Sequence, residues 1–334
     1  MDEALHRLLE RMATVRIGFV GDLCVDVYWM ADMTRSHLSL ETPHHPLPVV
    51  EERIGLGAGG NVLANLVALG PASIRAVGLL GDDWRGFLVR QELDRLGISR
   101  DRVFEERGRS TPAYCKPVRS GLSGVRYEDP RIDFAGTPVG RRLSAWLAEA
   151  VESLFGQVDV LCVCDQFPQG LVTPALRQRI NHLAERGMRV VVDSRDHVHL
   201  YRHGIAKPNE REFRGACRRL GIRAPEIGDA MIQFRERTDC QAIVTRGALG
   251  CLLEAWPGHV VQVPPGPDPD GPVDVCGAGD AFLAAFACAV STGASLSDAA
   301  LVGNLAASVA VGKIGTTGSA SPGEILDKYR LMAT

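Results

Sequence analysis

The sequence predicts a three-layer α/β fold, in which helices cover both faces of a mostly parallel central sheet. Two observations carry this prediction. Strand-like apolar runs alternate with helical patterns along most of the 334 residues. The first run, VRIGFVGDL (15–23), is almost continuously apolar, as expected of a strand that is buried on both faces. The length suits one large domain with an appended subdomain.

The remaining elements follow in the same alternation. Further predicted strands are 73–81, 158–165, 188–195, 241–247, 250–255 and 259–264. Predicted helices are 61–69, 84–96, 139–154, 173–186, 209–220, 226–237, 278–292 and 296–312. Two segments, 24–52 and 104–135, lack helical periodicity and carry Pro, Arg, His and Tyr. We expect residues 1–334 to form a single domain in which these two segments build a small β lid.

Composition excludes several classes of protein. Hydrophobic residues make up 46% and charged residues 23%, and the net charge of −3 gives no reason to expect nucleic acid or an anionic membrane as a partner. The N-terminal stretch MDEALHRLLERMATVR is amphipathic and acidic, which fits neither a signal peptide nor a membrane span. Most of the nine cysteines lie in apolar runs, typical of buried free thiols in a reducing compartment. We expect a cytoplasmic protein.

The stretch GLGAGGN (55–61) has the letters of a dinucleotide-binding fingerprint. Such a fingerprint belongs in the first strand-to-helix turn of its domain. Here the first strand ends in GDLCVD (21–26), and a polar, proline-containing excursion of about thirty residues separates the two. A dehydrogenase is therefore disfavoured.

The stretch DVCGAGDAFLAAFACAV (274–290) carries the chemistry more directly. Gly277, Ala278 and Gly279 precede or open a helix, whose N-terminal N–H groups can hold an anion. Asp280, in the first turn, either balances the helix dipole or accepts a proton from a hydroxyl that attacks a phosphoryl group.

Three other places suit phosphate or sugar chemistry. Asn209 and Glu212 form a helix-capping pattern that can also hold a hydrated Mg²⁺. Thr245 ends a predicted strand just before a glycine-rich turn, which fits a phosphate contact. Asp22 and Asp26 follow the first strand, either as turn residues or as acceptors for polyol hydroxyls.

The sequence resembles the ribokinase-like (PfkB) carbohydrate kinases over nearly its whole length. GAGGNVLANLVALG (57–70) is similar to the N-terminal signature of that family, and DVCGAGDAFLAAF (274–286) to its C-terminal signature. Within the family the resemblance is greatest to D-glycero-D-manno-heptose 7-phosphate kinases, through GDLCVDVYW, RIDF (131–134) and NLAASVAVGKIGT (304–316).

The resemblance implies an ATP- and Mg²⁺-dependent sugar kinase with Asp280 as the catalytic base. Gly277, Ala278 and Gly279 would hold the transferred γ-phosphoryl group. The residues implied on the nucleotide side are Asn209 and Glu212, which organise Mg²⁺ through water, with Thr245, Gly247, Gly250 and Asn304. Those implied on the sugar side are Asp22, Asp26, Gly57, Gly59, Asn61 and Lys116. Asp274 and the loop 312–319 resemble a monovalent-cation site, for which K⁺ is the expected ion.

Two residues depart from the family pattern. Val275 stands where relatives usually carry a threonine, and Ala58 stands where they carry the second of two adjacent glycines. The extra methyl group of Ala58 is expected to narrow the sugar pocket. Relatives are often fused to a nucleotidyltransferase, whereas this chain stops near residue 334 and is expected to be the kinase alone.

The resemblance also predicts a homodimer through the lid. A phosphorylated substrate would need cations in the lid half, for which Arg35, Lys116, Arg119 and Arg131 are candidates. Two alternatives stay open: a kinase for another sugar or sugar acid, such as fructose or 2-keto-3-deoxygluconate, and a non-catalytic sugar- or nucleotide-sensing module.

Overall fold

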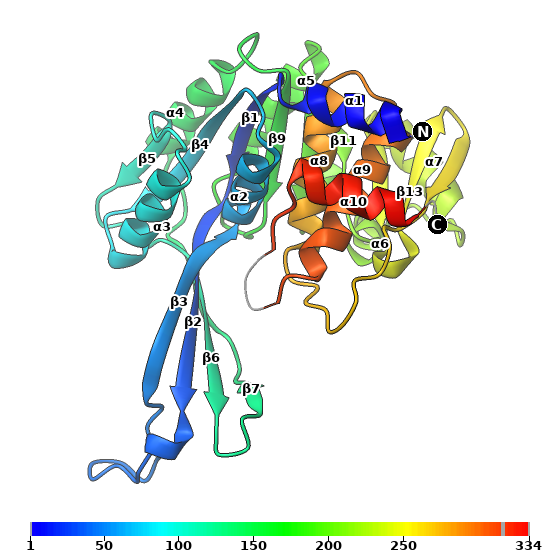
Figure 1. Ribbon diagram of the computed structural model, residues 1–334. Coiled ribbons are helices and arrows are strands. Elements are labelled where there is room, and N and C mark those ends of the chain that lie inside the picture. Colours follow the sequence, from blue (N-terminus) through cyan, green and yellow to red (C-terminus); the bar gives the residue numbers. More distant parts are fainter. Residues whose placement is uncertain (1, 315–317, 333–334) are drawn as a thin grey trace.

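A nine-stranded sheet forms the centre of the body in this computed structural model, which describes residues 2–314 and 318–332 (Figure 1). The strand order is β14-β13-β12-β11-β10-β9-β1-β4-β5. The strands are β1 (Arg16–Gly21), β4 (Ser73–Gly81), β5 (Val103–Glu106), β9 (Val160–Asp165), β10 (Val190–Ser194), β11 (Ile205–Ala206), β12 (Gln241–Thr245), β13 (Cys251–Trp256) and β14 (His259–Val263). All neighbours from β5 to β12 pair in parallel, and β13 and β14 complete the sheet as an antiparallel edge.

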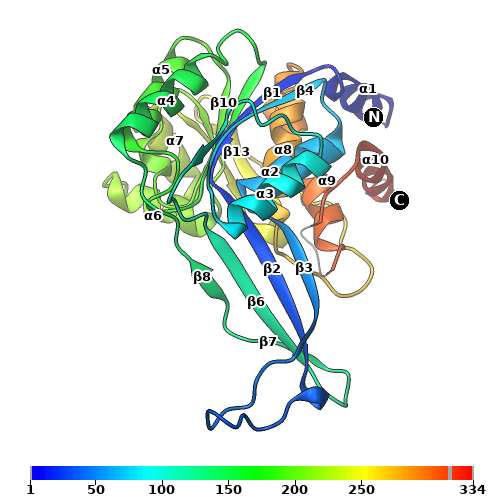
Figure 2. The same ribbon diagram turned by 90° about the vertical axis from the view of Figure 1, so that its left-hand side faces the viewer.

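Helices cover both faces of this sheet, which confirms the predicted three-layer α/β architecture (Figures 1 and 2). They are α1 (Asp2–Met12), α2 (Gly59–Leu69), α3 (Trp84–Arg95), α4 (Arg141–Glu152), α5 (Pro174–Glu185), α6 (Glu210–Arg219), α7 (Ile227–Thr238), α8 (Ala278–Ser291), α9 (Leu296–Val311) and α10 (Pro322–Leu331). Alternate residues of β1 serve the two faces: Ile17 and Phe19 join the core under α8 and α9, and Val20 joins the core under α4 to α7.

The sequence pattern predicts the helices from α2 to α9 but not those at the two ends of the chain. Helix α1 was recognised as amphipathic without being predicted as a helix, and its Leu5, Leu8 and Leu9 are buried against the body. Helix α10 lay beyond the last predicted element, and it packs against α9 and α1.

A second sheet projects from the body as a long arm (Figure 1). We call it the lid. It has the strand order β3-β2-β6-β7, with β8 paired to β6. Its strands are β2 (Leu23–Asp32), β3 (Val49–Ala58), β6 (Ala113–Ser120), β7 (Arg126–Glu128) and β8 (Ile132–Phe134).

The boundaries of the lid differ from the predicted segments in two ways. Strand β5 pairs with β4 in the body, so residues 104–106 do not belong to the lid, whose second segment begins with β6. Strand β3 continues to Ala58, so most of the GLGAGGN stretch lies on a lid strand rather than in a loop.

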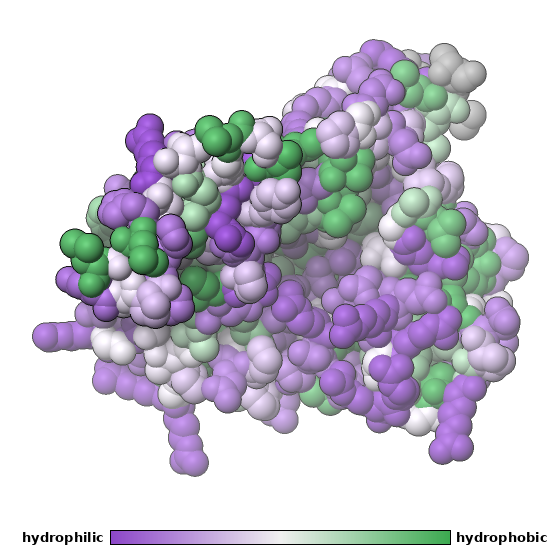
Figure 3. Space-filling model, turned by 90° about the horizontal axis from the view of Figure 1, so that it is seen from below, coloured by the Kyte–Doolittle hydropathy of each residue, from purple (hydrophilic) through white to green (hydrophobic). Residues whose placement is uncertain are grey.

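The lid stands away from the body, and the face seen from the lid end is hollowed between them (Figures 2 and 3). Only Asp22 separates β1 of the body from β2 of the lid.

Eight cysteines are buried free thiols, and Cys276 is an exposed one. Within the described ranges, no helix combines the length and the apolar character that crossing a membrane requires.

Candidate active site

A cavity of about 670 Å³ lies where the lid meets the body. It receives side chains from the lid, from the carboxyl ends of the parallel strands, and from the start of α8. Of the residues predicted from the sequence, those that line it are Asp26, Asn61, Lys116, Asn209, Glu212, Thr245, Gly247, Gly250, Gly277, Ala278, Gly279, Asp280 and Asn304. The structure thus brings together residues from both predicted signatures.

The N-terminus of α8 forms the floor of this cavity. Gly277 caps the helix with φ of +82°, a left-handed conformation that glycine adopts without strain. The first N–H groups of a helix have no partner within it, and here Gly279 leaves their approach open. A Cβ atom at Gly279 would lie 3.7 Å from Nζ of Lys207, which places a cation beside these amides. The floor is therefore suited to an anion.

Asp280 lies in the same helical turn, where the nearby Asn61 side chain acts to lower the pKa of its carboxyl group. Desolvation, and then the negative charge of Asp193, raise the pKa of Asp280 to about 7, against the opposing effect of Lys207. A carboxyl group with a pKa near neutrality can accept a proton from a hydroxyl and release it again.

Lys207 and Asp193 were missed by the sequence analysis. They form a buried ion pair at 3.1 Å, with side chains 4% and 9% exposed. Asp193 is the last residue but one of β10 and Lys207 follows β11, so both lie at the same edge of the sheet as Asp165 and Thr245. The signal was available, because each follows an apolar run at the carboxyl end of a strand.

The predicted Asn209–Glu212 pair caps α6 as a reciprocal capping box. The Asn209 N–H donates to Oε2 of Glu212, and the Glu212 N–H donates to Oδ1 of Asn209, both at 2.9 Å. Asn209 also forms a parallel bridge with Thr245 of β12, which brings the two predicted phosphate-side positions together. Desolvation and the charge of Asp193 raise the pKa of Glu212.

Asn304 closes the far end of the cavity from α9. Its side-chain amide donates to the carbonyl oxygens of Val263 and Pro264, at 3.3 and 2.7 Å. These bonds fix the loop that follows β14, so Asn304 shapes the wall of the cavity through this loop.

On the lid side, Asp26 and Lys116 face the cavity from neighbouring strands. Nζ of Lys116 lies 3.7 Å from Oδ2 of Asp26 and donates to the Tyr28 hydroxyl at 2.7 Å. Oδ1 of Asp26 is buried and has no hydrogen-bond partner among the described atoms. A Cβ atom on Gly57 would lie 2.2 Å from this oxygen, so the glycine leaves the space that the carboxylate occupies.

Two further cations line the cavity beside Tyr114. The Arg131 guanidinium lies 3.9 Å from the centre of the Tyr114 ring and pairs with Asp133. Arg195, which the sequence pattern did not indicate, follows β10, and its positive charge acts to lower the pKa of the Tyr114 hydroxyl. Of the four predicted lid cations, Lys116 and Arg131 therefore line the cavity.

The other two predicted cations lie elsewhere. Arg35 pairs with Asp32 near the tip of the lid, and Arg119 pairs with Asp129 on its surface. Neither lines the cavity.

Three residues that were predicted on the sugar side do not line the cavity: Asp22, Gly57 and Gly59. The Asp22 carboxylate instead accepts N–H bonds from Gln166, Phe167 and Leu171, at 2.6 to 2.9 Å. The Gly59 N–H donates to the Asp22 carbonyl oxygen at 2.8 Å. Asp22 and Gly59 both hold the junction between lid and body.

Ala58 lines the cavity with an unusual backbone. It has φ of +48° and ψ of −128°, a conformation that glycine adopts readily and alanine adopts only under strain. The departure from the family pattern therefore has a conformational effect in addition to the extra methyl group.

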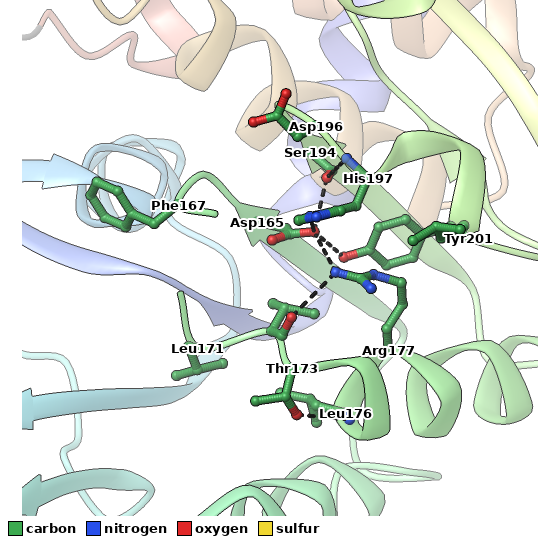
Figure 4. A network of polar contacts seen from close by, with 12 residues as sticks. Asp165, Phe167, Leu171, Thr173, Leu176, Arg177, Ser194, Asp196, His197 and Tyr201 are labelled. Atoms are coloured by element: carbon green, nitrogen blue, oxygen red, sulfur yellow. Dashed lines mark hydrogen bonds and ion pairs between the residues drawn. The ribbon is translucent and has the colours of Figure 1, made fainter. Parts of the chain in front are cut away.

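A buried network on Asp165 supports the rim of the cavity (Figure 4). Its Oδ2 atom accepts hydrogen bonds from Ser194 at 2.8 Å and Tyr201 at 3.0 Å, and lies 3.3 Å from both Arg177 Nη2 and His197 Nδ1. These donors hold the pKa of Asp165 below its ordinary value despite burial. The network fixes the strand ends that carry Gln166 and Arg195 into the cavity.

The predicted monovalent-cation site is only partly described. Oδ1 of Asp274 accepts a hydrogen bond from the Cys276 N–H at 2.9 Å. The partner loop 312–319 includes residues 315–317, which lie outside the described residues. Val275, the other departure from the family pattern, is exposed and lines the cavity.

A doubly covered, mostly parallel sheet, a β lid, and a helix N-terminus suited to an anion beside a carboxylate are typical of one class: kinases that phosphorylate a hydroxyl of a small molecule. The chain matches the profile of the pfkB family carbohydrate kinases over residues 20–322 and belongs to that family. It is a phosphotransferase with an alcohol group as acceptor.

Similar proteins agree with this assignment. Bifunctional protein HldE of Trichlorobacter lovleyi is 28% identical over 331 residues, which cover 96% of this chain and 64% of that protein. Bifunctional protein HldE of Geobacter metallireducens is 30% identical over 314 residues, covering 92% and 61%. The chain thus spans less than two thirds of the length of these relatives.

Solved structures show the same fold. Ribokinase from Thermotoga maritima gives a TM-score of 0.68 at 20% identity, covering 95% of this chain and 99% of that one. Phosphofructokinase-2 from Escherichia coli in complex with fructose-6-phosphate gives 0.73 at 20% identity, covering 96% and 100%.

Proposed function

We propose that the protein transfers the γ-phosphoryl group of ATP to a hydroxyl of a sugar phosphate, with heptose 7-phosphate as the first candidate. The observation that carries this proposal is Asp280, a carboxyl group with a pKa of about 7 next to the anion-binding start of α8. The attacking hydroxyl would give its proton to Asp280 while the amides at Gly277 to Gly279 hold the transferred group.

Lys207 supports the same reaction. It is buried between Asp193 and the start of α8, and its positive charge makes the floor of the cavity attractive to a phosphoryl group. The Asp193 carboxylate holds its Nζ atom at 3.1 Å, so this charge is positioned before any ligand arrives.

The nucleotide would lie along Asn209, Thr245, Gly247 and Gly250 toward Asn304. Mg²⁺ fits this side, because the capping box engages one carboxylate oxygen of Glu212 and leaves the other for a water ligand. The described residues hold no group of three or more side chains that would cage a metal, which suits an ion held mainly by phosphates and water. Bound Mg²⁺ would neutralise charge on the phosphate oxygens.

The sugar would lie between Asp26 and Asp280. The unpaired Oδ1 atom of Asp26 is a buried acceptor, which a sugar hydroxyl would satisfy. Asn61 also lines the cavity, and its side chain acts on the pKa of Asp280.

Three cations favour a substrate that already carries a phosphate. Lys116, Arg131 and Arg195 line the cavity from the lid and from the end of β10. Lys116 and Arg131 each have one carboxylate partner, so their donors are not exhausted, and guanidinium groups bind phosphate oxygens in pairs. An unphosphorylated sugar would offer no anionic oxygen to the donors of Lys116 and Arg131 that remain unused.

We also propose a homodimer through the lid. Apolar side chains are exposed on β3 (Val49, Val50 and Ile54) and around β7 (Val125 and Tyr127). Apolar residues exposed on a sheet that projects from the body of a protein are commonly covered by a partner molecule. Light scattering at micromolar concentration should show a dimer, and a monomer would contradict this part of the proposal.

The substrate is tested with a panel in an ADP-release assay: heptose 7-phosphate, fructose 6-phosphate, fructose and 2-keto-3-deoxygluconate, each with ATP and Mg²⁺. We expect turnover on a phosphorylated sugar. Turnover only on unphosphorylated substrates would refute the sugar-phosphate assignment. Binding of sugar and ATP without any ADP release would instead favour the sensing module.

A further inference from the structure

A second cavity of about 340 Å³ lies at the hinge of the lid, apart from the active-site cavity. We call it the hinge cavity. No lining residue is shared between the two. The hinge cavity is lined by Asp22, Leu23, Leu79, Arg109, Pro112, Ala135, Gly136, Phe167, Pro168, Gln169, Gly170 and Leu171.

Three of the connections between lid and body pass this cavity. Leu23 is the first residue of β2, Pro112 immediately precedes β6, and Ala135 immediately follows β8. A molecule bound here would contact every one of these connections at the point where the lid leaves the body.

Arg109 gives the hinge cavity its chemistry. Its side chain is 4% exposed, and Nε and Nη1 are buried without a hydrogen-bond partner among the described atoms. The nearest carboxylate oxygen, on Glu106, lies 3.7 Å from Nη1, which is too long for a hydrogen bond. A buried guanidinium with unmet donors is costly, and an anionic ligand would remove that cost.

The other lining residues indicate which charge and which shape of anion would fit the hinge cavity. Both Asp22 oxygens already accept backbone N–H bonds, so Asp22 contributes negative charge without needing Arg109. That charge repels a dianion such as phosphate about twice as strongly as a monoanion, so it favours a ligand with a single negative charge. Leu23, Leu79 and Leu171 provide an apolar wall. A carboxylate can bind a guanidinium through two parallel hydrogen bonds, with an apolar body against this wall.

One wall connects the two cavities. Phe167 lines the hinge cavity, and its ring centre lies 5.8 Å from that of Tyr114, which lines the active-site cavity. Tyr114 in turn lies under Arg131. Gln166, the residue before Phe167, also lines the active-site cavity. A ligand that contacts Phe167 would therefore lie next to residues on the sugar side of the active-site cavity.

We propose that the hinge cavity binds a small monocarboxylate with an apolar body, held by Arg109, and that its binding restrains the lid. This second site is independent of the identity of the sugar.

The test is isothermal titration calorimetry of the full chain with butyrate and, separately, with inorganic phosphate. We expect butyrate to bind with a dissociation constant of about 1 mM or tighter, as befits a ligand of few atoms, and phosphate not to compete with it. Arg109→Met should weaken butyrate binding at least about tenfold, because it removes the charged partner. The exposed Arg107 provides the matched control, and Arg107→Met should bind butyrate as the wild type does.

Ala135→Phe is the second variant, since it places a ring at the exposed mouth of the cavity and leaves Arg109 intact. It should also lose butyrate binding. Restraint of the lid is measured by amide hydrogen exchange, in which butyrate should slow exchange in residues 113–120 and 166–171 of the wild type but not of Arg109→Met.

Equal butyrate binding by the wild type and both variants would overturn the site. Binding of phosphate in place of butyrate, dependent on Arg109, would overturn the monocarboxylate assignment. Butyrate binding without slower exchange would overturn the restraint of the lid. None of these measurements needs sugar turnover, so their failure is distinct from failure of the proposed kinase substrate.

Discussion

Asp280→Asn should separate activity from stability. The amide keeps the shape of the side chain but cannot accept the proton of the attacking hydroxyl, so kcat should fall by about 10² to 10⁴-fold, equivalent to about 3 to 5 kcal/mol in the barrier. ATP binding should change little, because Asp280 faces the acceptor side. In the wild type, kcat/KM should fall about tenfold per pH unit below pH 7, as the base with a pKa of about 7 becomes protonated.

The same substitution should stabilise the fold at high pH. The pKa of Asp280 is raised from 3.8 to about 7 in the folded state, so the native protein holds this proton more tightly than the unfolded chain does. Stability is therefore lost as the pH rises from about 4 to about 7, by at most about 4 kcal/mol, since Asp280 is partly exposed. The asparagine side chain does not titrate, so the variant does not lose stability in this way as the pH rises.

Two measurements check this reasoning: ADP release under saturating ATP, and thermal unfolding from pH 5 to pH 8. The melting temperature of the variant should exceed that of the wild type by a margin that grows with pH. Asp298→Asn is the matched control, because Asp298 lies in the first turn of α9 but is exposed. Retention of more than about a tenth of the activity by Asp280→Asn would refute the role of the base. A melting temperature below that of the wild type at pH 8 would refute the electrostatic argument.

Three further substitutions test the geometry. Ala58→Gly should relieve a backbone strain of about 1 to 3 kcal/mol, partly offset by the greater entropy of the unfolded chain, and a raised urea midpoint would show it. Asp165→Asn should cost about 3 to 5 kcal/mol because it leaves a buried guanidinium without its counterion, whereas Asp196→Asn, at a half-exposed side chain 3.6 Å from Arg219, should be nearly neutral in the same urea titration. Arg195→Met should raise KM for the phosphorylated sugar without raising KM for ATP in steady-state assays, and the surface variant Arg119→Met should change neither.

The sequence predicted those parts of the site whose residues lie close together in the chain. Gly277, Gly279 and Asp280 lie within one helical turn, so their spacing alone places an anion site beside a carboxylate. The Asn209–Glu212 capping box is equally local. The body was predictable for a similar reason, because strands buried on both faces and amphipathic helices each leave a periodic pattern.

The sequence did not predict contacts between residues that are far apart in the chain, because these contacts depend on which strands pair in the sheet. Lys207 meets Asp193 only because β10 and β11 pair, and the Asp165 network joins the ends of β9 and β10 with α5. Asp22 was placed on the sugar side because carboxylates at a strand end commonly face a ligand. Its actual partners are N–H groups more than a hundred residues away, which no local pattern reveals.

The junction at Asp22 gives the lid the mechanics of a lever. Its backbone N–H donates to Cys164, its carbonyl oxygen accepts from Gly59, and its carboxylate is held by the loop after β9, so this point is a fixed fulcrum. The ten residues of β2 form a stiff beam of about 33 Å beyond it. A rotation of about 10° at the fulcrum would carry the tip through roughly 6 Å while the base barely moves. The protein can therefore convert a very small displacement beside Asp22 into a large one at the far end of the arm.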